Sequence, residues 1–173
     1  MGQDKALLQW QGETLLHRAI ALLQQTGANE VLVSGRDGIA DLLPHCGPPG
    51  AVLSLLDFLQ EHDQLDGAPL LLIPVDMPLL TQPTLQILLQ HIVPGHGTRF
   101  RNQIFPCILP ASASLFLHLQ QLFRDARHLG GQRSLRALLE FAKAEPVDDA
   151  AIPAQEFRNF NTPSEWAGLT HGQ

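Results

Sequence analysis

Charged residues are scarce in this sequence, and no run of lysine or arginine stands out along it. Lysine and arginine number 11 and aspartate and glutamate 17 in 173 residues, so the formal net charge is −6 and only 16% of the chain is charged. Nucleic acids and anionic membranes are bound by clustered positive charge. The sequence therefore predicts neither partner.

Long apolar runs and paired cysteines are also missing. No apolar stretch approaches the 18 or more residues of a membrane span, and the first ten residues lack the basic start and apolar stretch of a signal peptide. Cys46 and Cys107 form no C-x-x-C pair, which excludes a disulfide framework and a zinc ribbon. We expect a cytoplasmic protein.

Several motifs of common enzyme classes are absent. The eight histidines are scattered and none belongs to an H-E-x-x-H zinc motif. The sequence has no G-x-S-x-G around a nucleophilic serine and no G-x-x-x-x-G-K-[ST] phosphate loop. Hydrolases of the serine type and P-loop enzymes lose their main support.

What the sequence does contain is an alternation of helical and extended apolar patterns, at 45% hydrophobic residues. This length and composition predict one domain over residues 1–173. Apolar spacing predicts helices over 14–23, 52–59, 82–91, 113–126 and 134–142, strands over 30–34, 70–75, 98–101 and 104–109, and a loop over 146–153.

Alternating strands and helices predict an α/β fold in which a mostly parallel sheet is covered by helices on both faces. The continuous apolar run at 70–75 is the expected central strand. Ligands of such sheets bind beyond the carboxyl ends of the strands. Functional residues are therefore expected after residues 33 and 75 and before residue 162.

Asp76 and Lys5 are candidates for binding phosphate and metal. Asp76 follows the predicted central strand, where a carboxylate can share a hard cation with a phosphate, although an aspartate before a proline turn is also common. Lys5 follows a glycine near the chain start and can meet phosphate as a point charge, or can be a surface lysine.

Backbone and amide groups complete the candidate site. The 47–50 segment, which begins at Gly47, can bring backbone close to a ligand, or be an ordinary connection. Asn159 and Asn161 offer amide groups, which can orient a phosphate or satisfy the loop itself. They precede a predicted capping box, T-P-S-E at 162–165, so we expect both at a strand end or turn.

Taken in order, these motifs resemble one family over essentially the whole chain, that of the molybdenum cofactor guanylyltransferases among the nucleotidyltransferases. The similarity is carried by M-G-Q-D-K at 1–5, G-P-P at 47–49, P-V-D-M-P at 74–78, G-Q-R-S-L-R-A-L-L at 131–139 and N-F-N-T-P at 159–163. The resemblance implies a three-layer Rossmann-like nucleotidyltransferase fold. It also implies transfer of GMP from GTP to molybdopterin with release of pyrophosphate, dependent on Mg²⁺.

The resemblance also implies roles for individual residues. Lys5 matches the family's phosphate-binding lysine and Asp76 its magnesium-binding aspartate. Asp41 and the loop at Gly47 match positions near the nucleotide. Asn159 and Asn161 match asparagines on the pterin side. Contacts with other proteins of cofactor biosynthesis are expected from the same likeness.

The sequence departs from the family pattern at its start. The family opens with a strand and a loop of the form L-A-G-G-x-S-x-R before M-G-x-D-K, whereas this chain starts at that methionine. The first strand, the loop and its arginine are thus expected to be missing. Unpaired backbone groups and a slot in the core are the expected result.

Smaller departures leave the selectivity of the site open. Ser34 stands where the family tends to have asparagine, and Ala51 replaces the last glycine of G-P-L-x-G. Related cytidylyltransferases or other nucleotidyltransferases remain alternatives. So do a non-catalytic relative that binds molybdopterin and a remnant that does not fold.

Overall fold

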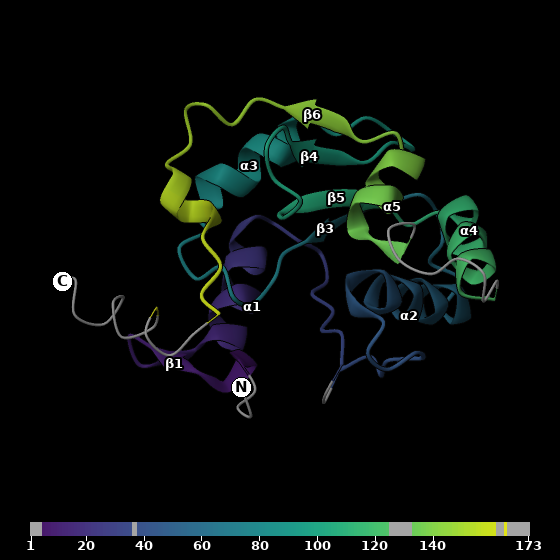
Figure 1. Ribbon diagram of the computed structural model, residues 1–173, viewed down its shortest axis with the longest axis horizontal. Coiled ribbons are helices and arrows are strands. Elements are labelled where there is room, and N and C mark those ends of the chain that lie inside the picture. Colours follow the sequence, from purple (N-terminus) through teal and green to yellow (C-terminus); the bar gives the residue numbers. More distant parts are fainter. Residues whose placement is uncertain (1–4, 36–37, 125–132, 162–164, 166–173) are drawn as a thin grey trace.

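The computed structural model describes residues 5–35, 38–124, 133–161 and 165. Two short strands form a hairpin near the start, four form the main sheet, and five helices pack around that sheet (Figure 1). The 3-10 helices are η1 (Lys5–Leu7) and η3 (Ala154–Phe157), the strands β1 (Gln9–Trp10), β2 (Glu13–Thr14), β3 (Pro69–Leu72), β4 (Thr98–Phe100), β5 (Cys107–Pro110) and β6 (Glu145–Val147), and the α-helices α1 (Leu15–Gln25), α2 (Gly47–Glu61), α3 (Gln82–Gln90), α4 (Ala113–Arg124) and α5 (Leu135–Phe141).

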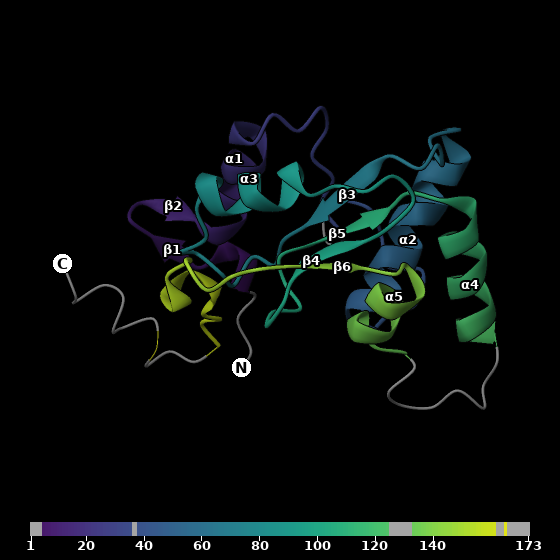
Figure 2. The same cartoon turned by 90° about the horizontal axis from the view of Figure 1, so that it is seen from above.

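The main sheet has the strand order β3-β5-β4-β6 (Figure 2). β5 is antiparallel to both β3 and β4, and only β4 and β6 are parallel. The α/β fold class is confirmed, but the prediction of a mostly parallel sheet is wrong for the described strands. The reason is that residues 101–106 join β4 to β5 directly, and so short a connection cannot make the crossover that a parallel pair requires.

Helices cover both faces of this sheet, as a three-layer fold requires. On one face Cys107 and Leu109 pack with residues of α2, α4 and α5. On the other face Ile108, between them in β5, packs with Leu88 of α3 and with Phe157 of η3. Successive residues of a strand point to opposite faces, so β5 supplies side chains to both cores.

Three helices begin directly after a residue whose side chain caps them. The side chains of Thr14, Thr81 and Ser134 accept hydrogen bonds from backbone N–H groups three residues later, at the starts of α1, α3 and α5. Such caps satisfy N–H groups that have no partner within the helix. The helices predicted over 82–91, 113–126 and 134–142 are confirmed within two residues at each end.

Other elements differ from the prediction. α2 begins at Gly47 instead of residue 52, so the 47–50 segment forms its first turn. Proline is well suited there because its missing N–H would be unpaired anyway. β6 lies in the predicted loop 146–153 and consists of three residues paired only with β4. The β1–β2 hairpin was not predicted. It turns at Gln11 and Gly12, both of which have positive φ.

The strand predicted over 30–34 is not formed. Ser34 makes an isolated bridge with Ile39, and residues 31–33 have no ladder with β3, which is an edge strand among the described ones. Hollows of about 470 and 590 Å³ lie between this segment and β3, both lined by Leu32 and Leu71. An extended segment becomes a strand only where a neighbour pairs with it, and these hollows separate residues 31–33 from β3.

Of the helices that the structure describes, not one combines the length and the apolar character that crossing a membrane requires.

Candidate active site

Lys5, Asp76 and Asn161 meet at one point of the molecule although they are far apart in sequence. Lys5 Nζ lies 3.0 Å from Asp76 Oδ2 and also donates a hydrogen bond to Asn161 Oδ1. Both side chains of the ion pair are largely buried, at 29% and 20% exposure. The structure thus joins three of the residues singled out in the sequence into one polar cluster.

Backbone hydrogen bonds position these three side chains. Lys5 begins η1, whose next residue, Ala6, is buried. Asp76 follows β3 after three further residues. The N–H of Phe160, a buried residue, donates to the carbonyl of Asp76 at 2.9 Å and so brings the adjacent Asn161 to the carboxylate. The site therefore depends on segments from the start, the middle and the end of the chain.

Asp41 and Gly47 lie in a second group next to this cluster. Both line the hollow of about 590 Å³, together with Pro74, two residues before Asp76. Asp41 accepts a hydrogen bond from Ser34 Oγ at 3.4 Å. Because the hollow reaches Pro74, it lies at the end of β3 that leads to Asp76.

The predicted capping box and the start of the first motif fall partly outside the described residues. Residues 162–164 and 1–4 are not described, whereas Glu165 accepts a hydrogen bond from the Asn161 N–H at 2.8 Å. Asn159 is exposed on the segment after η3. In the described part of the chain, no hydrogen bond joins it to Lys5 or Asp76.

The donor set fits a metal held jointly by protein and phosphate. The described residues contain no group of three or more His, Cys, Asp or Glu side chains that could hold an ion by themselves. Within the same residues the hydrogen bonds of the Asp76 carboxylate involve Oδ2, which leaves Oδ1 for a cation. Mg²⁺ is commonly bound by one or two carboxylates together with substrate phosphates and water. Asp76 could contribute one such ligand.

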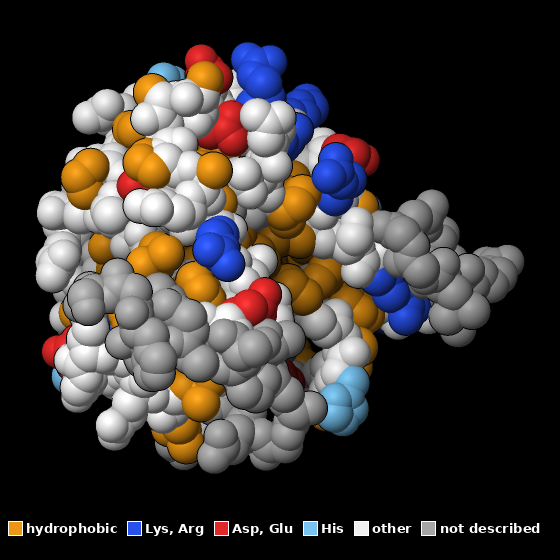
Figure 3. All heavy atoms as spheres, turned by 60° about the vertical axis from the view of Figure 1, so that its left-hand side comes forward, with side chains coloured by type: hydrophobic (Ala, Val, Ile, Leu, Met, Phe, Trp, Pro, Cys, Tyr) orange, Lys and Arg blue, Asp and Glu red, His pale blue; other side chains and the backbone are white. Residues whose placement is uncertain are grey.

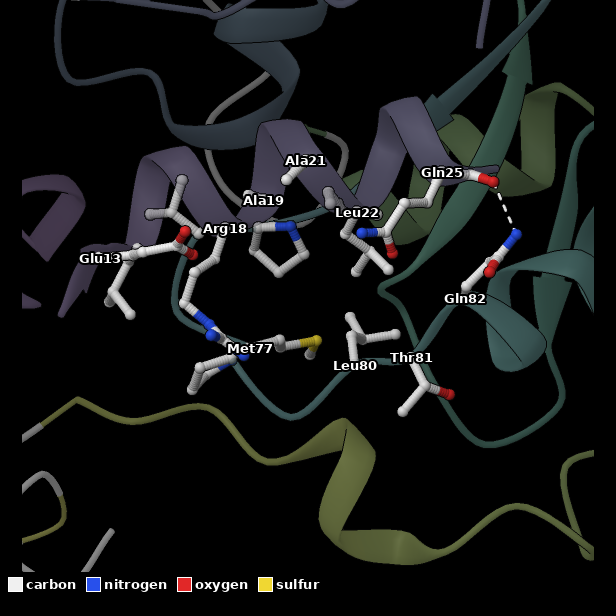
Figure 4. A pocket seen from close by; sticks show the side chains of 15 residues that line it. Glu13, Arg18, Ala19, Ala21, Leu22, Gln25, Met77, Leu80, Thr81 and Gln82 are labelled. Atoms are coloured by element: carbon white, nitrogen blue, oxygen red, sulfur yellow. Dashed lines mark hydrogen bonds between the residues drawn. The ribbon is translucent and has the colours of Figure 1, made fainter. Parts of the chain in front are cut away.

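Sequence reasoning did not single out the hollow of about 300 Å³ between α1 and residues 77–82 (Figure 4). Arg18 reaches into it from α1 and stacks over Trp10, with 4.2 Å between the guanidinium carbon and the ring centre. At its far end Gln82 Nε2 donates to the backbone carbonyl of Gln25 at 2.6 Å. This hollow faces α1, and Asp76 is not among its lining residues.

Hydrophobic side chains line a hollow on the face that carries both the N-terminal elements and the segment after η3 (Figure 3). Single cationic and acidic groups stand at its rim, and further Lys and Arg side chains gather near one edge of this face. An apolar hollow with single charged groups at its rim agrees with a site for a small ligand.

Sequence reasoning also missed Glu156. Its side chain is buried and accepts hydrogen bonds from the hydroxyls of Thr84 and Thr81, which lie 72 and 75 positions earlier in the chain. A lone acidic residue in a stretch without periodicity gives no local indication of such contacts.

Comparisons with known proteins identify the family. Residues 1–148 match the MobA-like NTP transferase domain. A curated protein of Xanthomonas euvesicatoria pv. vesicatoria (strain 85-10), named molybdenum cofactor guanylyltransferase, is 40% identical over 178 aligned positions, which cover 99% of this chain and 88% of that protein. With the domain match over most of its length, this chain belongs to the MobA-like NTP transferase family.

Proposed function

We propose that this protein transfers GMP from GTP to molybdopterin, which forms the guanine dinucleotide form of the molybdenum cofactor and releases pyrophosphate. The relative from Xanthomonas carries this activity in its name and matches almost the whole chain. The observation that supports it most is the meeting of Lys5, Asp76 and Asn161. A cation, a carboxylate and an amide at one sheet edge can neutralise and orient a triphosphate.

In this proposal the residues divide between the two substrates. Asp76 binds Mg²⁺ and Lys5 binds the phosphates of GTP. Asp41 and Gly47 line the side of the nucleotide, in the hollow next to Pro74. Asn159 and Asn161 face molybdopterin. The contact of Asn161 with Lys5 supports a position for Asn161 between the two substrates.

The reaction needs charge compensation more than covalent chemistry. An oxygen of the terminal phosphate of molybdopterin attacks the α-phosphorus of GTP, and the bond from that phosphorus to the bridging oxygen breaks as pyrophosphate leaves. Bound Mg²⁺ would neutralise charge on the phosphates. Lys5 Nζ, which donates to Asp76 in this structure, would donate instead to phosphate oxygens when GTP is bound.

A nucleotide panel tests the proposal. The purified chain is incubated with molybdopterin, Mg²⁺ and GTP, CTP, ATP or UTP in turn, and pyrophosphate release is measured. Release with GTP alone is expected. Release with CTP alone would identify a cytidylyltransferase, and binding of molybdopterin without turnover of any nucleotide would identify a non-catalytic relative.

A further inference from the structure

Glu156 is a buried carboxylate with three hydrogen-bond donors on one oxygen. It is 8% exposed and lies in η3. Its Oε2 accepts hydrogen bonds from the Thr81 hydroxyl at 2.8 Å, the Thr84 hydroxyl at 2.7 Å and the Thr81 N–H at 3.2 Å. Burial of a carboxylate is costly unless it is hydrogen-bonded in this way. The contact is therefore a specific one.

The donors lie at the N-terminus of α3. Thr81 is the capping residue of this helix, and the first turn contains no acidic residue. A helix N-terminus carries partial positive charge and stabilises a nearby anion. Glu156 supplies that anion from a segment 75 positions further along the chain, so η3 is fixed to the start of α3.

A second contact ties the same segment to Asp76. The N–H of Phe160 donates to the Asp76 carbonyl at 2.9 Å. Residues 156–160 are therefore joined to both ends of residues 76–81, at Asp76 by a backbone bond and at Thr81 by the carboxylate of Glu156. Figure 1 shows this segment descending from η3 towards the N-terminal elements. Asn161 follows directly after the second contact.

We propose that Glu156 is a positioning residue of this enzyme: by fixing η3 to α3, it holds Asn161 against Lys5 and Asp76. The inference rests on the proposed function, in which Asn161 faces molybdopterin while Lys5 and Asp76 bind the nucleotide and its metal. Glu156 touches neither Lys5 nor Asn161 through any hydrogen bond of the described residues. It acts through the two threonines and the chain that follows it.

The same part of the chain offers a matched control. Asp149 is also buried, at 7% exposure, and its carboxylate accepts a hydrogen bond from Asn102 Nδ2 at 2.8 Å. Asn102 lies in the turn between β4 and β5, and its side chain makes no hydrogen bond with residues 76–81 among the described residues. Loss of either carboxylate should destabilise the fold, but only loss of Glu156 should loosen Asn161.

The experiment compares Glu156→Ala, Glu156→Gln and Asp149→Ala in the full chain. In Glu156→Ala we expect the KM for molybdopterin to rise about tenfold and the KM for GTP to change less than about twofold. Glu156→Gln should keep the KM for molybdopterin close to that of the wild type, since its amide oxygen can still accept hydrogen bonds from the threonines. Asp149→Ala should lower the melting temperature without raising either KM.

Equal rises of the molybdopterin KM in Glu156→Ala and Asp149→Ala, or no rise in Glu156→Ala, would overturn the proposal. If Glu156→Ala does not fold, Thr84→Val removes one of the three hydrogen bonds and is expected to give a smaller rise in the same KM. An inactive wild-type chain would overturn the proposed function instead. In that case hydrogen exchange still tests the positioning role of Glu156, because the Phe160 amide should exchange faster in Glu156→Ala than in Asp149→Ala.

Discussion

β3 has an apolar stretch of chain on each of its two sides, and the two stretches differ sharply. On one side lies β5, whose Ile108 and Leu109 are 1% and 0% exposed and which pairs with strands on both of its edges. On the other side residues 31–33 are equally apolar but only half buried, and hollows separate them from β3. Apolar composition alone thus does not produce a packed core, because the backbone must also find hydrogen-bond partners.

The two sides of β3 also differ in their proposed roles. The side of β5 holds the fully buried residues of α4 and α5, Leu119 and Leu138 among them. The side of residues 31–33 holds Asp41 and Gly47, the residues assigned here to the nucleotide. Binding segments are commonly drawn from the less stable parts of a protein. Substitutions on the two sides should therefore have different consequences.

The largest effect is expected at the site between the two sides. Asp76→Ala should lower turnover about thousandfold, because it removes the proposed ligand of Mg²⁺ at the reacting phosphate. The side chain lies at the edge of the sheet, so the melting temperature should stay close to that of the wild type. Asp66→Ala, an exposed aspartate before β3, is the control and should retain activity. Persistent turnover in Asp76→Ala would refute the metal assignment.

Next in size is the contrast between two leucines. Leu109→Ala should lower the free energy of unfolding by about 3 kcal/mol, since it leaves a cavity in a packed core. Leu32→Ala, next to an existing hollow, should cost less than about 1 kcal/mol. Urea unfolding of both variants measures the difference. Equal losses would show that the two sides of β3 are packed alike in solution.

A smaller effect is expected at Lys5. Lys5→Met should raise the KM for GTP about tenfold, because a charge-assisted hydrogen bond to phosphate is lost. The chain's other lysine, Lys143, is exposed after α5, so Lys143→Met is the matched control. Steady-state kinetics with varied GTP will show the change. An unaltered KM would place the triphosphate elsewhere.

The smallest effect concerns the thiols of Cys107 and Cys46, which lie on opposite sides of β3. Burial raises the pKa of Cys107 to about 12, so at pH 8 only about one molecule in 10⁴ carries its thiolate. Thiol alkylation should rise as the pH approaches that value, while Cys46, which lines the nucleotide hollow, reacts first. We expect GTP to slow the labelling of Cys46 about threefold. Mass spectrometry locates the label, and Cys46→Ser should remove it.

The helices could be predicted from the sequence because their evidence is local. Thr81 caps α3 and Ser134 caps α5, and each accepts a hydrogen bond from an N–H group only three residues later. The apolar spacing that follows them is also contained in one segment. Lys5 and Asp76 were recognised through the order of the family's motifs.

The strands and Glu156 depend on distant partners, and there prediction failed. The pattern at 30–34 is typical of a buried strand, yet among the described residues it forms only the isolated bridge from Ser34 to Ile39. β6 shows the opposite: residues 146–153 lack periodicity and were predicted to form a loop, but β4 supplies a partner with which β6 pairs. The contacts of Glu156 bridge more than 70 positions. None of these partners is visible in a local window.

The pairing of Lys5 with Asn161 has a consequence for the order of events during synthesis. The two residues are 156 positions apart, so the contact cannot form until residue 161 has left the ribosome. β3, β4 and β5 are complete by residue 110 and can begin to associate well before that. A nascent chain would therefore acquire its hydrophobic core first and its three-residue polar cluster last.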